Sequence, residues 1–274
     1  MAPQRPEAAP PRARGTLRLS SRLRDDGASV LDGLHMAGSV KALFPRGTGA
    51  AMQTVLLNTA GGITGGDAFD IEVSAGPGSH LVVTTQAAER IYRAAPGVPG
   101  RITTRLSVAE GATLGWLPQE TILFDAAALD RRLLVDAAPG ARVLACEALV
   151  FGRAAMGERV RSLHLRDRID LRLDGALAFA DRLRLDGDAA ARLERDAVAG
   201  GAHAMASLVL SAPGAARQLD AMREALGATG GASALSGDLV FARLLAEDSF
   251  ALRARLIPML TDLTQTAIPK TWTL

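Results

Sequence analysis

Four closely spaced glycines make residues 61–66 the stretch of the sequence that most resembles a ligand-binding loop. Gly61, Gly62, Gly65 and Gly66 allow the backbone to adopt positive φ or to approach a ligand closely. A phosphate-binding Walker loop needs Lys and then Ser or Thr after its last glycine, but Asp67 stands there. Beyond it, apolar and polar residues alternate, which predicts a strand and not the helix whose N-terminus would hold an anion. We expect a tight β-connection, and a nucleotide-binding enzyme is the weakest alternative.

Carboxylates beside turns and apolar strands are the other chemically suggestive residues. Carboxylate oxygens without a complete chelating set bind a hard or borderline divalent cation weakly and release it readily. The candidates for such a transient metal path are Asp67, Asp70, Glu147 and Asp181. For Asp67 the alternative is a turn cap, in which the carboxylate accepts backbone N–H bonds and fixes the loop.

Nucleophilic and metal-binding motifs are not found. The four histidines are scattered, without the short spacing of a metal site, and the single cysteine, Cys146, has no obvious histidine partner. The sequence therefore predicts a protein that is not an enzyme. Arg153 and Arg159 are candidates for ion pairs at a protein interface, and a solvated sheet face is the alternative for both.

Composition limits the class of protein further. The 274 residues are 48% hydrophobic and 4% aromatic, which predicts a large aliphatic core. The formal net charge of +2 gives no reason to expect nucleic acid as a partner. One cysteine fits a reducing compartment, and no run is apolar enough to span a bilayer, so we expect a cytoplasmic protein without a membrane anchor. Residues 1–14 read as a disordered leader, and residues 15–274 as a single domain.

Short apolar runs separated by glycine turns dominate the chain up to about residue 210. The turn glycines Gly78, Gly111, Gly140 and Gly175 are irregularly spaced, and Asp174 with Gly175 is typical of a two-residue hairpin. Without intervening helices, this pattern predicts a mainly β fold of stacked antiparallel strands, in a sandwich or a helix-like β arrangement.

The C-terminal quarter differs, and we expect about two α-helices there. Pro213 opens a segment with a helical stripe that ends at Gly227, and leucines at helical spacing mark a second helix over residues 252–263. Between them, residues 228–237 read as a loop of small residues, and the last seven residues as an extended tail.

Several segments of the chain form a collinear set of motifs, and they are KALFPRG (41–47), VLLNTAGGITGGDAFD (55–70), TTQAAERIYRA (84–94), WLPQETILFDAA (116–127), ALVFGRAAMGE (148–158), ADRLRLDG (180–187) and the closing residues 268–274. Together these motifs resemble the urease accessory protein family UreD, called UreH in some organisms. The resemblance implies a single UreD-like domain, mostly β, with strands stacked in a helix-like manner and few helices.

In function, the resemblance implies a non-enzymatic chaperone. It would bind apo-urease with UreF and the GTPase UreG and would support nickel delivery to the urease active site through an internal water-filled passage. No tightly bound cofactor is expected, only a transient nickel ion, and GTP hydrolysis would belong to UreG. The late helices and residues 151–161 are expected to contribute to partner contacts. A β-rich interaction module without a metal role is the remaining alternative.

Overall fold

The computed structural model describes residues 11–46, 49–153, 156–264 and 268–273. The expected leader therefore falls largely outside the described residues. Its last residues are part of the described fold. The first strand, β1 (Arg14–Leu23), already begins at Arg14, and the N–H of Ala13 donates to Asp67 Oδ1 at 2.8 Å.

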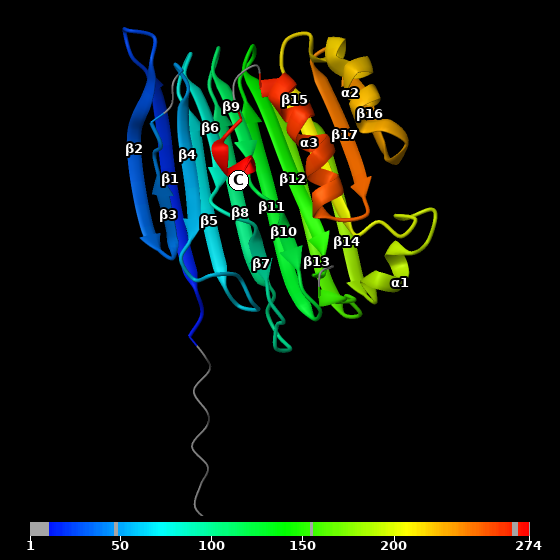
Figure 1. Ribbon diagram of the computed structural model, residues 1–274. Helices are drawn as coiled ribbons and strands as arrows, with labels where there is room; N and C mark the ends of the chain where they lie inside the picture. Colours follow the sequence, from blue (N-terminus) through cyan, green and yellow to red (C-terminus); the bar gives the residue numbers. More distant parts are fainter. Residues whose placement is uncertain (1–10, 47–48, 154–155, 265–267, 274) are drawn as a thin grey trace, which may run out of the picture.

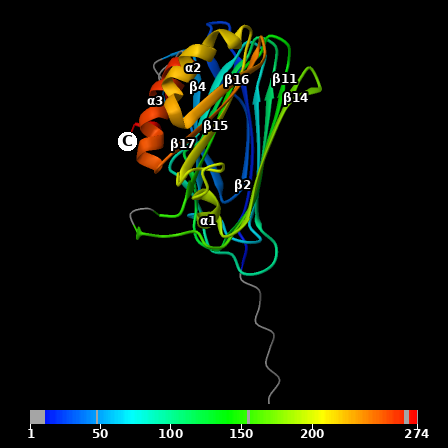
Figure 2. The ribbon, with the colours of Figure 1, turned by 90° about the vertical axis from the view of Figure 1, so that its right-hand side faces the viewer.

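Within the described residues the strands form two facing sheets (Figures 1 and 2). Sheet A is ordered β14 (Ala176–Gly187), β13 (Leu163–Leu173), β11 (Ala127–Ala137), β8 (Gly100–Val108), β5 (Ala68–Ala75), β1 and β2 (Ser29–Gly38). Sheet B is ordered β16 (Gly230–Ser236), β17 (Leu239–Ala246), β15 (Ala204–Ser211), β12 (Arg142–Phe151), β9 (Thr113–Leu117), β6 (His80–Thr85), β4 (Met52–Asn58) and β3 (Val40–Leu43), with β10 (Thr121–Leu123) and β7 (Glu89–Ile91) attached.

The mainly β, helix-like arrangement is as predicted, but the pairing in its centre is parallel. Successive strands from β4 to β13 pass back and forth between the sheets, so that β5, β8, β11 and β13 are parallel neighbours in sheet A. In sheet B, β4, β6, β9 and β12 are parallel in the same way. Antiparallel pairing, which we expected throughout, joins β1 with β2 and β13 with β14 at the two ends of sheet A. In sheet B it joins β3 with β4 at one end, and at the other end it continues from β12 through β15 and β17 to β16.

The sequence was misleading here because a short glycine turn looks the same whether it closes a hairpin or leads the chain from one sheet to the other. Gly78, Gly111 and Gly140 have positive φ at such sheet-to-sheet turns. The hairpin at Asp174 and Gly175 is confirmed, with φ of 50° and 75° between β13 and β14.

Two apolar layers hold the fold together. The inner layer lies between the sheets and includes Leu17, Leu106 and Leu165, all fully buried. The helix layer lies between the other face of sheet B and the two C-terminal helices, and includes Leu208 and Leu256. Figure 2 shows these two helices over sheet B, whereas the far face of sheet A is not covered by any helix of the described chain. Along a strand such as β13, half-buried polar residues on that face alternate with buried residues that face the inner layer.

The two late helices are confirmed. They are α2 (Leu219–Leu226), preceded by the 3-10 turn η2 (Ala215–Gln218) and followed by η3 (Gly227–Thr229), and α3 (Ser249–Thr264), with Pro258 inside it. A short helix not expected from the sequence, α1 (Ala189–Leu193), follows β14 and is capped by Asp188. No helix in the described part of the chain has the length and apolar character needed to cross a membrane.

Two local predictions near the C-terminus are wrong. The expected loop over residues 228–237 contains the edge strand β16, which pairs antiparallel with β17. Its small residues hide the strand signal, since only Ala232 in it is buried. In the tail, expected to be extended, Lys270–Trp272 form the 3-10 turn η4, and the indole N–H of Trp272 donates to the carbonyl of Leu117 at 2.9 Å.

Candidate functional site

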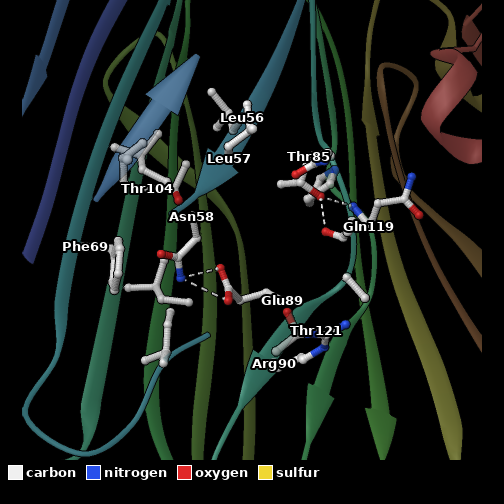
Figure 3. A pocket seen from close by; sticks show the side chains of 18 of the residues that line it. Leu56, Leu57, Asn58, Phe69, Thr85, Glu89, Arg90, Thr104, Gln119 and Thr121 are labelled. Atoms are coloured by element: carbon white, nitrogen blue, oxygen red, sulfur yellow. Dashed lines mark hydrogen bonds between the residues drawn. The ribbon is translucent and has the colours of Figure 1, made fainter. Parts of the chain in front are cut away.

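A cavity of about 320 Å³ lies between the sheets, at the level where the glycine loop meets β7 (Figure 3). Its walls come from both sheets, since Phe69 and Thr104 of sheet A and Leu56 of sheet B line it. The lining is largely apolar, but charged side chains also reach it, and these are Glu89, Arg90, Arg131 and Glu147.

A buried ion-pair network forms one part of the wall. The Arg131 guanidinium binds Asp167 with both ends, Nε to Oδ1 at 2.9 Å and Nη2 to Oδ2 at 2.6 Å. Its Nη1 lies 2.6 Å from Glu147 Oε2 and 3.0 Å from the hydroxyl of Thr121. The indole N–H of Trp116 donates to the other Glu147 oxygen at 2.8 Å. The network thus ties β11 and β13 of sheet A to β9, β10 and β12 of sheet B.

The network contains two carboxylates for one guanidinium. Burial raises the pKa of Glu147, against the nearby charge of Arg131, which lowers it. Although burial works against its charge, Arg131 has a raised pKa because Asp167 and Glu147 lie beside it. Arg131 therefore stays charged, and Glu147 is the member that most readily carries a proton in the absence of a second cation.

Glu89 is a second titratable group on the cavity wall. Burial raises the pKa of Glu89 to about 7, with the Asn58 hydrogen bond as the larger opposing cause. The Asn58 amide nitrogen lies 3.1 and 3.2 Å from the two carboxylate oxygens, as Figure 3 shows. The charge of Glu89 therefore changes near neutral pH.

The glycine loop borders the cavity at Gly61 and enters β5, as predicted. Gly61, Gly62 and Gly66 have positive φ. A Cβ on Gly62 would stand 2.3 Å from the ring of Tyr92, so the close packing of β7 against the loop requires glycine there. Both Asp67 oxygens accept backbone N–H bonds, from Thr64 and from Ala13, at 2.8 Å each. This is the geometry of the turn cap.

The four predicted metal-path carboxylates are not brought together. Glu147 lines the cavity, and Asp67 caps the loop. Asp70 lies on the outer face of sheet A, 3.7 Å from Arg101 and 4.0 Å from Arg105. Asp181 faces inward from β14 and pairs with Arg243 of β17, across the sheets. Among the described residues, no group of three or more His, Cys, Asp or Glu side chains could hold a metal ion.

The two predicted interface arginines lie at the surface, each in an ion pair. Arg153 binds Glu158 at 2.8 Å and stacks on the ring of Phe124, with 47% of its side chain exposed. Arg159 pairs with Glu194 and is 51% exposed. Both remain accessible to a partner protein.

Arg131, Asp167, Trp116 and Glu89 were missed as site residues. For two of them the sequence carries a signal. Arg131 stands at an inward position of β11 between Leu129 and Leu133, and Asp167 stands likewise in β13. A charged residue of each sign, in phase with the buried residues of its strand, indicates a buried pair.

Comparison with known proteins identifies the relatives of this chain. Residues 13–273 match the family described as UreD urease accessory protein. A protein of Ruegeria sp. named urease accessory protein UreD is 50% identical over 289 aligned residues, covering 100% of this chain and 97% of that protein. Similar proteins of that name from Roseobacter denitrificans and Brucella suis are 50% and 43% identical, each covering 96% of this chain and 96% and 95% of their own lengths.

Proposed function

The chain belongs to the UreD family of urease accessory proteins, and from this premise we propose that it supports urease maturation as a scaffold and as a conduit for nickel. In this proposal nickel is cargo, which enters the cavity between the sheets and leaves it toward apo-urease. The chain itself carries out no catalytic step, and it holds no tightly bound cofactor.

The observation that carries the nickel proposal is the excess of buried carboxylate in the ion-pair network beside the cavity, where Glu147 lines the wall. Glu147 and Asp167 share the single guanidinium of Arg131. A cation that reaches Glu147 would replace its proton, and it would meet one carboxylate and no chelating cluster. Weak binding of this kind suits a path, because the ion must leave again. Asp181, which also faces the space between the sheets, is the second residue that we assign to the path.

The partners in this proposal are the urease structural subunits, UreF and, through the complex, UreG. GTP hydrolysis would belong to UreG, since Asp67 replaces the phosphate-binding lysine in the glycine loop of this chain. Arg153 and Arg159 are proposed partner contacts on the accessible surface. The proposed location is the cytoplasm, where the single buried thiol of Cys146 would stay reduced.

Co-expression tests the proposal as a whole. Urease structural subunits are produced with UreF and UreG, with and without this chain, and urease activity and nickel content are measured. We expect active, nickel-loaded urease only when the chain is present. Equal activation in its absence would exclude the proposed role.

A matched pair of substitutions tests the conduit separately. Glu147→Gln keeps the shape and one acceptor oxygen but removes the ionisable carboxyl group at the cavity, whereas Asp70→Asn makes the same chemical change on the outer face. We expect Glu147→Gln to lower the nickel content of urease while the complex still assembles, and Asp70→Asn to leave it unchanged. Equal nickel content with both variants would favour the alternative, an interaction module without a metal role.

A further inference from the structure

The outer face of sheet A is a large, flat, polar surface. In the strands β11 and β13, residues that face the inner layer are buried and those between them are exposed or half-buried. The helices α2 and α3 lie over sheet B, and no helix of the described chain covers this face (Figure 2). The surface is therefore accessible in the isolated chain.

Arginines lie side by side on this face. In the strand register Arg132 of β11 is paired with Arg168 of β13, and Arg168 with Arg182 of β14. At the next position on the same face, two residues away along β13 and β14, Arg166 is paired with Arg184. Neighbouring strands are about 4.8 Å apart, so these guanidinium groups lie in two adjacent rows, and in the second row Asp130 of β11 stands beside Arg166.

Some of these arginines are neutralised and others are not. Arg182 pairs with Asp170, and Arg184 with Asp186. Within the described part of the chain, the side chains of Arg132, Arg166 and Arg168 have no hydrogen bond or ion pair. We call these three residues the arginine patch.

Within the arginine patch, Arg132 and Arg168 are directly opposite each other, and like charges in this arrangement disfavour a sheet. The guanidinium group matches a carboxylate with two parallel N–H donors, so unpaired guanidiniums are well suited to binding an acidic surface. Two carboxylates one helical turn apart are about 5–6 Å from each other, close to the spacing between neighbouring strands.

We propose that the arginine patch is a docking surface for an acidic face of a partner protein in urease maturation, which rests on the proposed function. The partner is a protein and not a nucleic acid because carboxylates are interspersed on the same face. Asp130 is the strand neighbour of Arg166, and Asp170 follows Arg168 by two residues. These carboxylates interrupt the basic face that a continuous phosphate backbone would need, whereas a protein surface can match a mixed pattern of charge.

Charge reversal tests the patch in the full chain. The variant is Arg132→Glu with Arg168→Glu. The matched control is Arg192→Glu with Arg195→Glu, on α1 and the turn after it, which changes the net charge by the same amount outside the sheet. The affinity for purified apo-urease, with UreF and UreG bound or absent, is measured at low and high salt.

We expect the patch variant to bind about tenfold more weakly at low salt, the salt dependence to shrink, and the control to bind like the wild type. A neutral variant, Arg132→Gln with Arg168→Gln, should fall between them and guards against misfolding of the charge-reversed one. Unchanged binding of both patch variants, while the wild type activates urease, would overturn the docking surface and leave the proposed function standing. Weaker binding to a short DNA duplex with unchanged binding to the proteins would overturn it as well. Failure of the wild type to activate urease would instead count against the proposed function.

Discussion

The inner layer and the helix layer share sheet B, but they differ in the number and position of their charged side chains. The inner layer carries Arg131 with two carboxylates near its centre and leaves a cavity beside them. The helix layer is packed with aliphatic residues, and its half-buried arginine, Arg253, lies at the end near the C-terminus. There it binds Glu120 at 3.1 Å and the carbonyl of Trp272 at 2.6 Å.

The two arginines differ in how many carboxylates surround them, and this difference distinguishes a structural ion pair from a candidate functional site. Arg253 meets one carboxylate and neutral oxygen acceptors, including Gln119 at 2.6 Å, so the ion pair at the edge of the helix layer is balanced. Arg131 meets two carboxylates, which leaves the inner layer with a charge that only a proton or another cation compensates. We infer that the helix layer stabilises the fold, whereas the buried charged groups of the inner layer lower its free energy of unfolding.

The largest effect is expected from Arg131→Met, which leaves Glu147 and Asp167 buried without their cation. Breaking a buried ion pair by removing one partner costs about 3–5 kcal/mol. Denaturant unfolding should show this loss. Adding Glu147→Gln and Asp167→Asn to the same chain should recover most of it, because no ionisable group then remains in the network. A loss below about 1 kcal/mol in the single variant would mean that the network is more hydrated than its burial indicates.

Leu256→Ala probes the helix layer with no charge involved. Leu256 in α3 is fully buried, and a Leu→Ala change in such a site costs about 2–5 kcal/mol through lost transfer energy and a cavity. Unlike the Arg131 variant, this one should show a loss of stability that is independent of pH between 5 and 8. A loss that varies with pH would show that the two layers are electrostatically coupled. Leu235→Ala, at a half-exposed position of β16, is the control.

Glu89→Gln tests the pH dependence of the inner layer. The pKa of Glu89 is about 7 in the folded chain, whereas its ordinary value is 4.5. Between these two pH values the folded state therefore binds more protons than the unfolded state. Stability should therefore fall as the pH rises from about 4.5 to 7, by about 3 kcal/mol, and stay level above. The Gln variant lacks this slope and should be more stable than the wild type at pH 8. Parallel stability curves for the two proteins would contradict the raised pKa.

Sequence patterns predict what is local in this molecule. The alternation after Asp67 gives β5, the leucine spacing gives α3, and Asp174 with Gly175 gives the hairpin. Each depends on the period of a few residues or on the backbone preference of one turn. The parallel pairing of β5 with β8 depends on where the chain goes between them, which no local pattern contains.

The candidate site was predicted only in part for the same reason. Glu147 was a candidate because it stands in an apolar strand, but its partners Arg131 and Trp116 come from other strands. Asp70 and Asp181 stand in similar local sequence patterns. Tertiary packing places Asp70 on the outer face of sheet A, and Asp181 between the sheets near their edge. The burial of a carboxylate is a property of the packed layers, and its strand alone does not determine it.

The smallest effect is expected at Asp67, where the inner layer and the glycine loop meet. In Asp67→Asn the amide oxygen still accepts one of the two backbone N–H bonds, but the amide nitrogen faces the other donor. The loss should be about 1–2 kcal/mol by denaturant unfolding, with no change in urease nickel content. Asp70→Asn, with only solvent-exposed ion pairs, should cost less. Because a cap and a metal ligand need the same carboxylate, the two measurements must be read together: stability lost with nickel retained means a cap, whereas nickel lost at unchanged stability would place Asp67 on the nickel path.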